Sequence, residues 1–145
     1  MSDMDSPAGA SATVAGRRRP YMVVGEVPAA MAVPGGRGAG YWPVVQLIKD
    51  WNNQPECRDL MLAGGLPDGT GAVTAAKIAA VVHALCLRDG HPLPEWVLLA
   101  RSPVDVALVP EVDLASPYGQ RLRQNAPGVC RLHGVYFSVV DLRST

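Results

Sequence analysis

Proline opens most of the apolar segments in the second part of the chain, and this spacing restricts the fold more than any other feature. It stands at or before the start of five such segments, as Pro43, Pro55, Pro94, Pro117 and Pro127. Because proline lacks an N–H and has a fixed φ, it suits the first turn of a helix and is excluded from a helix interior. The sequence therefore predicts an all-α fold, a compact bundle of about five short helices.

The first 40 residues differ in composition from the rest of the chain. Nineteen of them are Gly, Ala or Pro, so this part has little apolar surface to offset the entropy lost on ordering. We expect residues 1–40 to form a mobile arm and residues 41–145 to form the helical domain. Within the arm, β-branched residues between positions 21 and 33 indicate an extended segment. If the first part of the tail is a mis-assigned start, Met22 or Met31 would be the true beginning.

Apolar periodicity places the individual helices. Residues 43–51 carry apolar side chains at helical spacing, and a second short helix is expected to follow from Pro55. The longest helix is expected from Ala72 to Arg88, where Gly90 provides a stop. This helix is small or apolar on nearly every side, which is typical of a central helix with close neighbours.

The remainder of the chain is predicted to contain shorter elements. We expect a helix at 95–101, an irregular segment at 103–115, a helix at 116–124 capped by Ser116, a further turn after Pro127 and a short extended segment at 135–137. In the first of these helices, Trp96 and Leu99 are expected to face inward. Leu142 is expected to dock the end of the chain onto the bundle.

The bulk composition argues against membrane association and secretion. The formal net charge is zero, so no overall field attracts the chain to nucleic acid or to an acidic membrane. No stretch approaches the roughly 18 consecutive apolar residues of a membrane span. The basic triplet at 17–19 is followed by an apolar run that Gly and Pro interrupt, unlike a signal peptide. Three cysteines without a CxxC pair favour reduced thiols. We expect a cytoplasmic protein.

Polar residues are not spaced for catalysis or for cofactor binding. The three histidines are far apart and no CxxC or HxxxH pair accompanies them, so no metal site is expected. A nucleophilic site could be drawn from Ser138, His133 and Asp141, or from Cys130 and His133, but no Gly-x-Ser-x-Gly elbow supports it. A phosphate-binding loop needs a strand before it and a helix with a suitable Lys or Ser/Thr after it, whereas Trp42-Pro43 follows the glycine-rich run at 35–40, which we interpret as a linker. We expect a protein that is not an enzyme and binds no cofactor.

A protein partner is the first kind of ligand that the sequence favours. An extended segment can add to the sheet edge or fill the cleft of a partner, and a small domain does not bury all of its aromatic residues. The expected contact residues are Tyr21, Met22, Val23, Val24, Val27, Trp51, Trp96 and Tyr118. A dispensable tail and a fully buried set of aromatic residues are the competing interpretation.

DNA is the alternative ligand. Residues 117–145 contain four arginines and one acidic residue, a local charge of +3, whereas residues 95–113 carry a local charge of −3. The expected contacts to phosphate are Arg121, Arg123, Arg131 and His133. Neutralisation of the basic segment by the acidic one, through ion pairs on the surface, is the competing interpretation.

Three blocks of the second part resemble a known group of proteins. The blocks are "PVVQLIKDW", "AAVVHALCLRDGHPLPEWV" and "NAPGVCRLHGVYFSVVDL". Their shared positions are Gly90, Pro92, Pro94, Trp96, Ala126, Pro127, Arg131, His133, Gly134, Val135, Tyr136, Asp141 and Leu142. Over residues 41–142 the chain is similar to small helical proteins of actinobacteria that look like partner components of toxin–antitoxin-type gene pairs.

The resemblance implies a binding role and supplies no catalytic residues. Our leading expectation is a non-catalytic, antitoxin-like or regulatory protein that binds another protein, such as the product of a neighbouring gene. A DNA-binding transcriptional regulator is the alternative, and the sequence leaves a homo-oligomer open.

Overall fold

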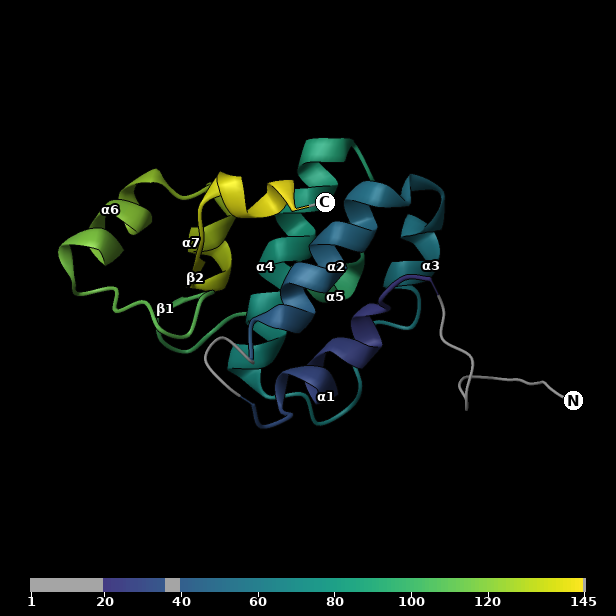
Figure 1. Ribbon diagram of the computed structural model, residues 1–145, viewed down its shortest axis with the longest axis horizontal. Helices are drawn as coiled ribbons and strands as arrows, with labels where there is room; N and C mark the ends of the chain where they lie inside the picture. Colours follow the sequence, from purple (N-terminus) through teal and green to yellow (C-terminus); the bar gives the residue numbers. More distant parts are fainter. Residues whose placement is uncertain (1–19, 36–39, 145) are drawn as a thin grey trace, which may run out of the picture.

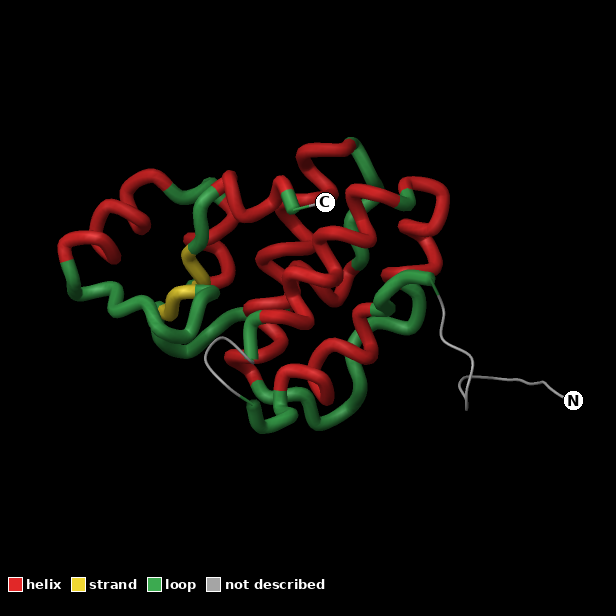
Figure 2. The backbone as a smooth tube through the Cα atoms, viewed as in Figure 1, coloured by secondary structure: helices red, strands yellow, loops and turns green. Residues whose placement is uncertain are grey.

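The computed structural model describes residues 20–35 and 40–144, and the regular secondary structure in this part of the chain is almost entirely helical (Figure 1). Figure 2 shows helices joined by loops and one small sheet, whose two strands have two residues each. The elements in chain order are η1 (Val24–Glu26), α1 (Val27–Met31), α2 (Trp42–Asn53), η2 (Pro55–Cys57), α3 (Arg58–Leu62), α4 (Ala72–Asp89), α5 (Glu95–Leu99), β1 (Val106–Ala107), α6 (Pro117–Asn125), α7 (Val129–His133), β2 (Val135–Tyr136) and η3 (Val139–Arg143). The predicted all-α bundle of short, proline-initiated helices is confirmed.

Helix α4 is the central element. It packs against α1, α2, α5 and α7, and its residues from Ile78 to Cys86 are all buried. Its alanines allow the neighbouring backbones to approach closely, as the composition of this segment predicts. The helix ends where Gly90 adopts a left-handed conformation with φ 67°, which places no strain on a residue without a Cβ.

The segment after Pro20 belongs to the bundle. Val24 and Val27 are fully buried in the same core as α2 and α4. The backbone N–H of Met22 donates to Oδ2 of Asp50 at 2.6 Å, which ties this segment to α2. The helical domain therefore extends toward the N-terminus beyond residue 41, the boundary that composition indicates.

The prediction of an extended segment at 21–33 is wrong for most of its length, because residues 24–31 are helical. The β-branched residues suggest a strand when counted alone, but two of them stand three positions apart and share one helical face. Pro28 lies in the first turn of α1, where proline is favoured. The remaining positions assigned to the arm, residues 1–19 and 36–39, lie outside the described residues.

The predicted short extended segment after Gly134 is confirmed, and it has a partner that the sequence did not reveal. Strands β1 and β2 run parallel, with Val106 opposite Val135 and Ala107 opposite Tyr136. The N–H of Val106 donates to the carbonyl of Gly134 at 2.9 Å. This pairing holds the otherwise irregular segment 103–115 against the bundle.

Helix α5 turns a different face inward from the one predicted. Val97 is fully buried, whereas Leu99 is 79% exposed, so the prediction that Leu99 faces inward is wrong. Trp96 is half-buried and packs against the turn at Gly65. Because the helix stops at Leu99, a single turn with Val97 at its centre sets the orientation.

Helix α6 stands apart from the rest of the bundle (Figure 1). As predicted, Ser116 caps it, since its side-chain oxygen accepts from the N–H of Gly119 at 3.0 Å. Gly119 is the one residue of α6 that is buried. The helix is therefore held mainly at its ends and by individual side chains.

Candidate functional site

The groups that could form a nucleophilic site are occupied by local structure. The Ser138 hydroxyl accepts from the N–H of Val140, and the Asp141 carboxylate accepts from the N–H of Ser138, so both groups cap η3. Cys130 is buried, and burial raises the pKa of its thiol to about 11. His133 is 2% exposed and points to other partners. These residues do not assemble around a common reacting position.

A buried pair of histidines links three elements. Nε2 of His133 lies 2.9 Å from Nδ1 of His83 on α4, and Nδ1 of His133 lies 2.6 Å from the carbonyl oxygen of Ala100 after α5. Because a carbonyl only accepts, Nδ1 of His133 carries a proton, and in the neutral pair Nε2 accepts from His83. Burial, together with the neighbouring His133, lowers the pKa of His83. The pair is a structural link that joins α4, α7 and the end of α5.

A second polar cluster closes the C-terminal end of α4. The indole Nε1 of Trp51 donates to Oδ2 of Asp89 at 2.8 Å, and the guanidinium of Arg58 lies 4.9 Å above the Trp51 ring. Hydrogen bonds from Arg88, opposed by partial burial and helped by the Trp51 bond, lower the pKa of Asp89 to about 2. Every charge in the cluster has a partner, so it fastens α2 to α4 and offers no free group for chemistry.

Most of the residues predicted to contact a protein partner are packed within the fold. Val24, Val27 and Trp51 are fully buried, so the prediction that they lie at a contact surface is wrong. The reason is that α1 and α2 use these side chains to cover α4. Four others are half-buried: Tyr21, Met22, Val23 and Trp96.

Two aromatic side chains are exposed. Tyr118 on α6 is 56% exposed, as an anchor residue would be. Trp42 at the start of α2 is 61% exposed and was not among the predicted contacts. Its position directly before Pro43, outside the apolar spacing of the following helix, is the signal that could have identified it.

The residues predicted to contact DNA do not form one surface. His133 is buried, so its assignment is wrong, and the cause is its bonding to His83. Arg123 is bound to Asp105 at 2.9 Å and lies 4.9 Å above the Tyr136 ring. This ion pair joins the acidic and basic segments, as the competing interpretation expects. The remaining two, Arg121 and Arg131, are exposed on different helices.

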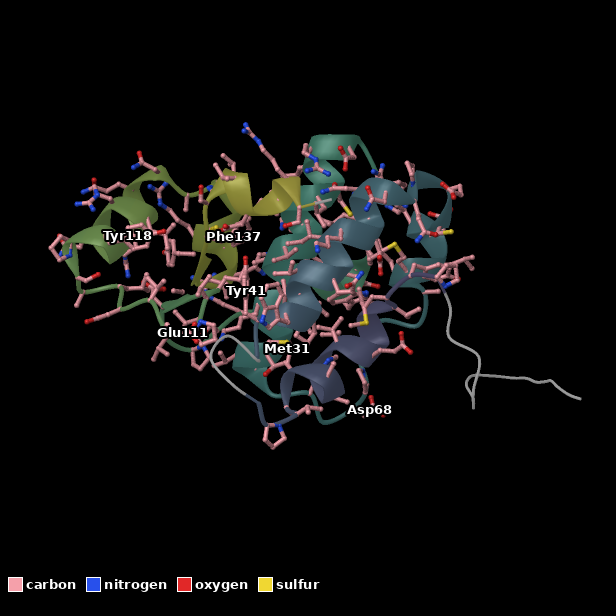
Figure 3. The ribbon with its side chains drawn as sticks, viewed as in Figure 1. Met31, Tyr41, Asp68, Glu111, Tyr118 and Phe137 are labelled. Carbon is pink, nitrogen blue, oxygen red and sulfur yellow. The ribbon has the colours of Figure 1, made fainter. Side chains whose placement is uncertain are left out.

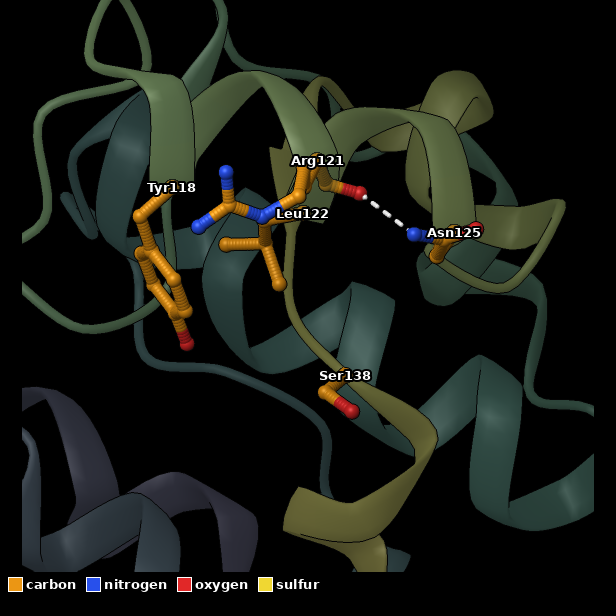
Figure 4. A pocket seen from close by; sticks show the side chains of 5 residues that line it. All are labelled: Tyr118, Arg121, Leu122, Asn125 and Ser138. Atoms are coloured by element: carbon orange, nitrogen blue, oxygen red, sulfur yellow. Dashed lines mark hydrogen bonds between the residues drawn. The ribbon is translucent and has the colours of Figure 1, made fainter.

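A shallow hollow of about 210 Å³ lies beside α6 (Figure 4). It is lined by Tyr118, Arg121, Leu122, Asn125 and Ser138. The four residues from α6 have the i, i+3, i+4, i+7 spacing of one helical face. Figure 3 shows Tyr118 on the outlying α6, apart from Tyr41 and Phe137 over the bundle. The hollow offers one guanidinium and two polar side chains but no buried polar group aimed into it.

Four exposed aliphatic side chains lie on α5, on α7 and in the segment that follows α5. Leu98, Leu99, Val104 and Leu132 are 62%, 79%, 61% and 56% exposed. The backbones that carry them are joined, because Arg101 donates to the carbonyl of Leu132 and the N–H of Ser102 donates to the carbonyl of His133, each at 2.8 Å.

We call Leu98, Leu99, Val104 and Leu132, together with Arg101 and Arg131, the α5–α7 surface. Both arginines are exposed, and among the described residues no carboxylate lies within ion-pair distance of either. An apolar centre with arginine at its margin is typical of protein interfaces, where arginine is enriched.

Comparison with protein-family models, curated proteins and solved structures finds no match for this chain. No helix in the described part combines the length and the apolar composition needed to cross a membrane. Among the same residues, no three His, Cys, Asp or Glu side chains gather as metal ligands would.

Proposed function

We propose that the protein is a non-catalytic protein-binding module, of the regulatory or antitoxin-like kind that the sequence resemblance implies, and that it binds through the α5–α7 surface. The observation that supports this proposal is the gathering of four large aliphatic side chains, between 56% and 79% exposed, on adjoining elements. Single exposed aliphatic residues are ordinary, but a contiguous group marks an interaction site.

The energetics of this surface favour a protein ligand. Complete burial of one leucine side chain stabilises a complex by about 1.5–3 kcal/mol, so Leu98, Leu99 and Leu132 can supply most of the affinity of a modest interface. The surface is also held in place before binding. The bonds from Arg101 and Ser102 to α7 fix the two elements relative to each other, which reduces the entropy lost on association.

Affinity capture with matched variants tests the proposal. The full chain carrying a tag is incubated with extract of its source cells, beside Leu99→Asp and the control Leu60→Asp. Leu60 is 58% exposed on α3, so both variants add one charge at an exposed leucine. We expect a stoichiometric protein, identified by mass spectrometry, to be lost from Leu99→Asp and retained by Leu60→Asp. Equal capture by all three chains contradicts the assignment of the surface.

DNA binding has less support. Of the four residues that the sequence suggests, two remain exposed without an ionic partner among the described residues, and they stand on separate helices. A gel shift on the promoter of its own gene tests this alternative. A shift that weakens with salt and disappears in the Arg121→Ala, Arg131→Ala double variant would replace the protein-binding proposal.

A further inference from the structure

The two ends of α5 carry opposite charges on either side of its exposed leucines. Glu95 begins the helix and Arg101 follows its end, each three positions from Leu98. Both side chains are exposed, and no ion pair joins either to another described residue. Arg101 uses one nitrogen, Nη1, for the carbonyl of Leu132. The segment is therefore complementary to itself when its direction is reversed.

Helical rotation places these groups on the outer side of α5. Successive residues are turned by about 100°, so Leu99 and Glu95 lie on the side away from buried Val97. Leu98 and Trp96 lie on opposite flanks of the same turn. Since Trp96 packs at the Gly65 turn, Leu98 lies on the other flank, which we assign to the α7 side.

We infer that the α5–α7 surface binds a second copy of this chain, with the two α5 segments antiparallel about a two-fold axis near Leu98. The inference rests on the proposed function, because it names the partner of the same surface. In this arrangement Glu95 of each copy lies beside Arg101 of the other. The leucines of both copies meet between the two ion pairs, as a self-complementary two-fold contact requires.

Charge complementarity favours a second copy over an unrelated partner. A foreign protein would have to present an acidic group and a basic group at the spacing of Glu95 and Arg101, with apolar side chains between them. The chain itself presents this pattern. Arg131, beside Leu132 on the same margin, has no carboxylate within ion-pair distance among the described residues and adds positive charge next to Arg101.

Sedimentation velocity of the full chain over a wide range of concentrations is the first measurement. We expect a monomer–dimer equilibrium. In a dimer of Leu99→Asp each copy places one carboxylate at the centre of the contact. The dissociation constant of the dimer should therefore rise about a hundredfold or more. Leu60→Asp should leave it unchanged. A protein that stays monomeric at every concentration overturns the inference.

Charge exchange tests the antiparallel arrangement. In a dimer of Glu95→Arg, each of the two contacts between positions 95 and 101 brings two arginines together. In a dimer of Arg101→Glu, each of these contacts brings two glutamates together. Each variant alone should raise the dissociation constant about tenfold. In a mixture of the two variants every contact joins opposite charges, so the mixed dimer should regain wild-type affinity. Failure of the mixture to associate better than either variant alone rules out this arrangement.

Thermal unfolding of each variant verifies that it folds. Arg101→Glu loses the bond to Leu132, so Arg101→Gln, whose amide can still donate to that carbonyl, serves as a second partner for Glu95→Arg. Their mixed dimer has one ion pair and no like-charge contact, so it should associate more tightly than Glu95→Arg alone. The measurements distinguish a failure of the self-association from a failure of the proposed binding function. A monomeric protein that captures a different protein through Leu99 overturns the self-association and leaves the binding function intact. A monomer that captures nothing through Leu99 overturns both.

Discussion

The clearest prediction concerns the two valines that anchor the N-terminal segment. If residues 20–33 were a dispensable arm, truncating Val24 or Val27 would have no effect on stability. Both side chains are 0% exposed and lie in one core with α2 and α4. Val24→Ala and Val27→Ala should therefore each destabilise the whole domain.

The magnitude follows from the atoms removed. Each substitution deletes two buried carbon groups, which lowers the transfer free energy by about 1.6 kcal/mol at about 0.8 kcal/mol per group. The cavity that remains adds to this loss because the surroundings relax only in part. We expect a total of about 2–3 kcal/mol for each valine. For a domain of ordinary stability, about 5–15 kcal/mol, either change is a substantial fraction.

Urea unfolding followed by tryptophan fluorescence measures the effect. The buried Trp51 indole, bound to Asp89, reports loss of the core when it becomes exposed. Val33→Ala is the matched control, since Val33 is 60% exposed, and it should change the free energy of unfolding by less than about 0.5 kcal/mol. Wild-type stability in both buried-valine variants would refute the placement of this segment in the core.

Three further predictions address other parts of the molecule. The fold lowers the pKa of His83, so the unfolded chain binds more protons in acid than the folded chain does. Stability should therefore be highest above about pH 6.5 and fall as the pH is lowered below it. Urea unfolding midpoints measured across this pH range check the prediction, and His83→Gln should flatten the pH dependence. Gly119→Ala should destabilise the domain by about 2 kcal/mol despite the helix propensity of alanine, because the added Cβ would lie 2.1 Å from the Asp113 carbonyl oxygen. At Gly128 an added Cβ would meet no atom within 4 Å, so Gly128→Ala should be nearly neutral. Thermal unfolding of the two variants measures the difference. Of the three free thiols, the half-buried Cys57 should react with a disulfide reagent in the native protein before the two buried ones, and simultaneous reaction of all three would contradict the packing.

Helix positions were predictable where a terminal signal and an apolar face agree. Helix α4 has both, because Gly90 stops it and its apolar side chains recur at helical spacing. Helix α6 shows Ser116 followed by Pro117, a cap and a favoured first residue. In each case local chemistry and tertiary packing require the same backbone.

The N-terminal segment was mispredicted because two local signals conflict there. Val23, Val24 and Val27 favour a strand by their β-branched shape, whereas Pro28 favours the start of a helix. Burial against α2 decides between them, and burial depends on contacts distant in the sequence. The pairing of Val106 with Val135 has the same origin, since nothing near either residue indicates its partner.

The surface was the least predictable feature. The sequence suggested aromatic anchors, yet Trp51 is buried in the core. Two of the exposed aliphatic side chains lie on α5, and a helix one turn long lets few residues face inward. Leu98 and Leu99 have the composition of core residues, and only the early end of the helix leaves them exposed.

The histidine pair connects the stability of the domain to its surface. Helices α5 and α7 have five residues each, too few to be stable alone. The bonds from His83 to His133 and from His133 to the Ala100 carbonyl hold both helices against α4. Burial, together with the neighbouring His133, lowers the pKa of His83, so protonation of His83 in acid would place a positive charge on a buried ring within this link. Acid should therefore disorder the α5–α7 surface before it unfolds α2. The pH at which association through this surface is lost should lie above the pH at which the fluorescence of the buried Trp51 changes.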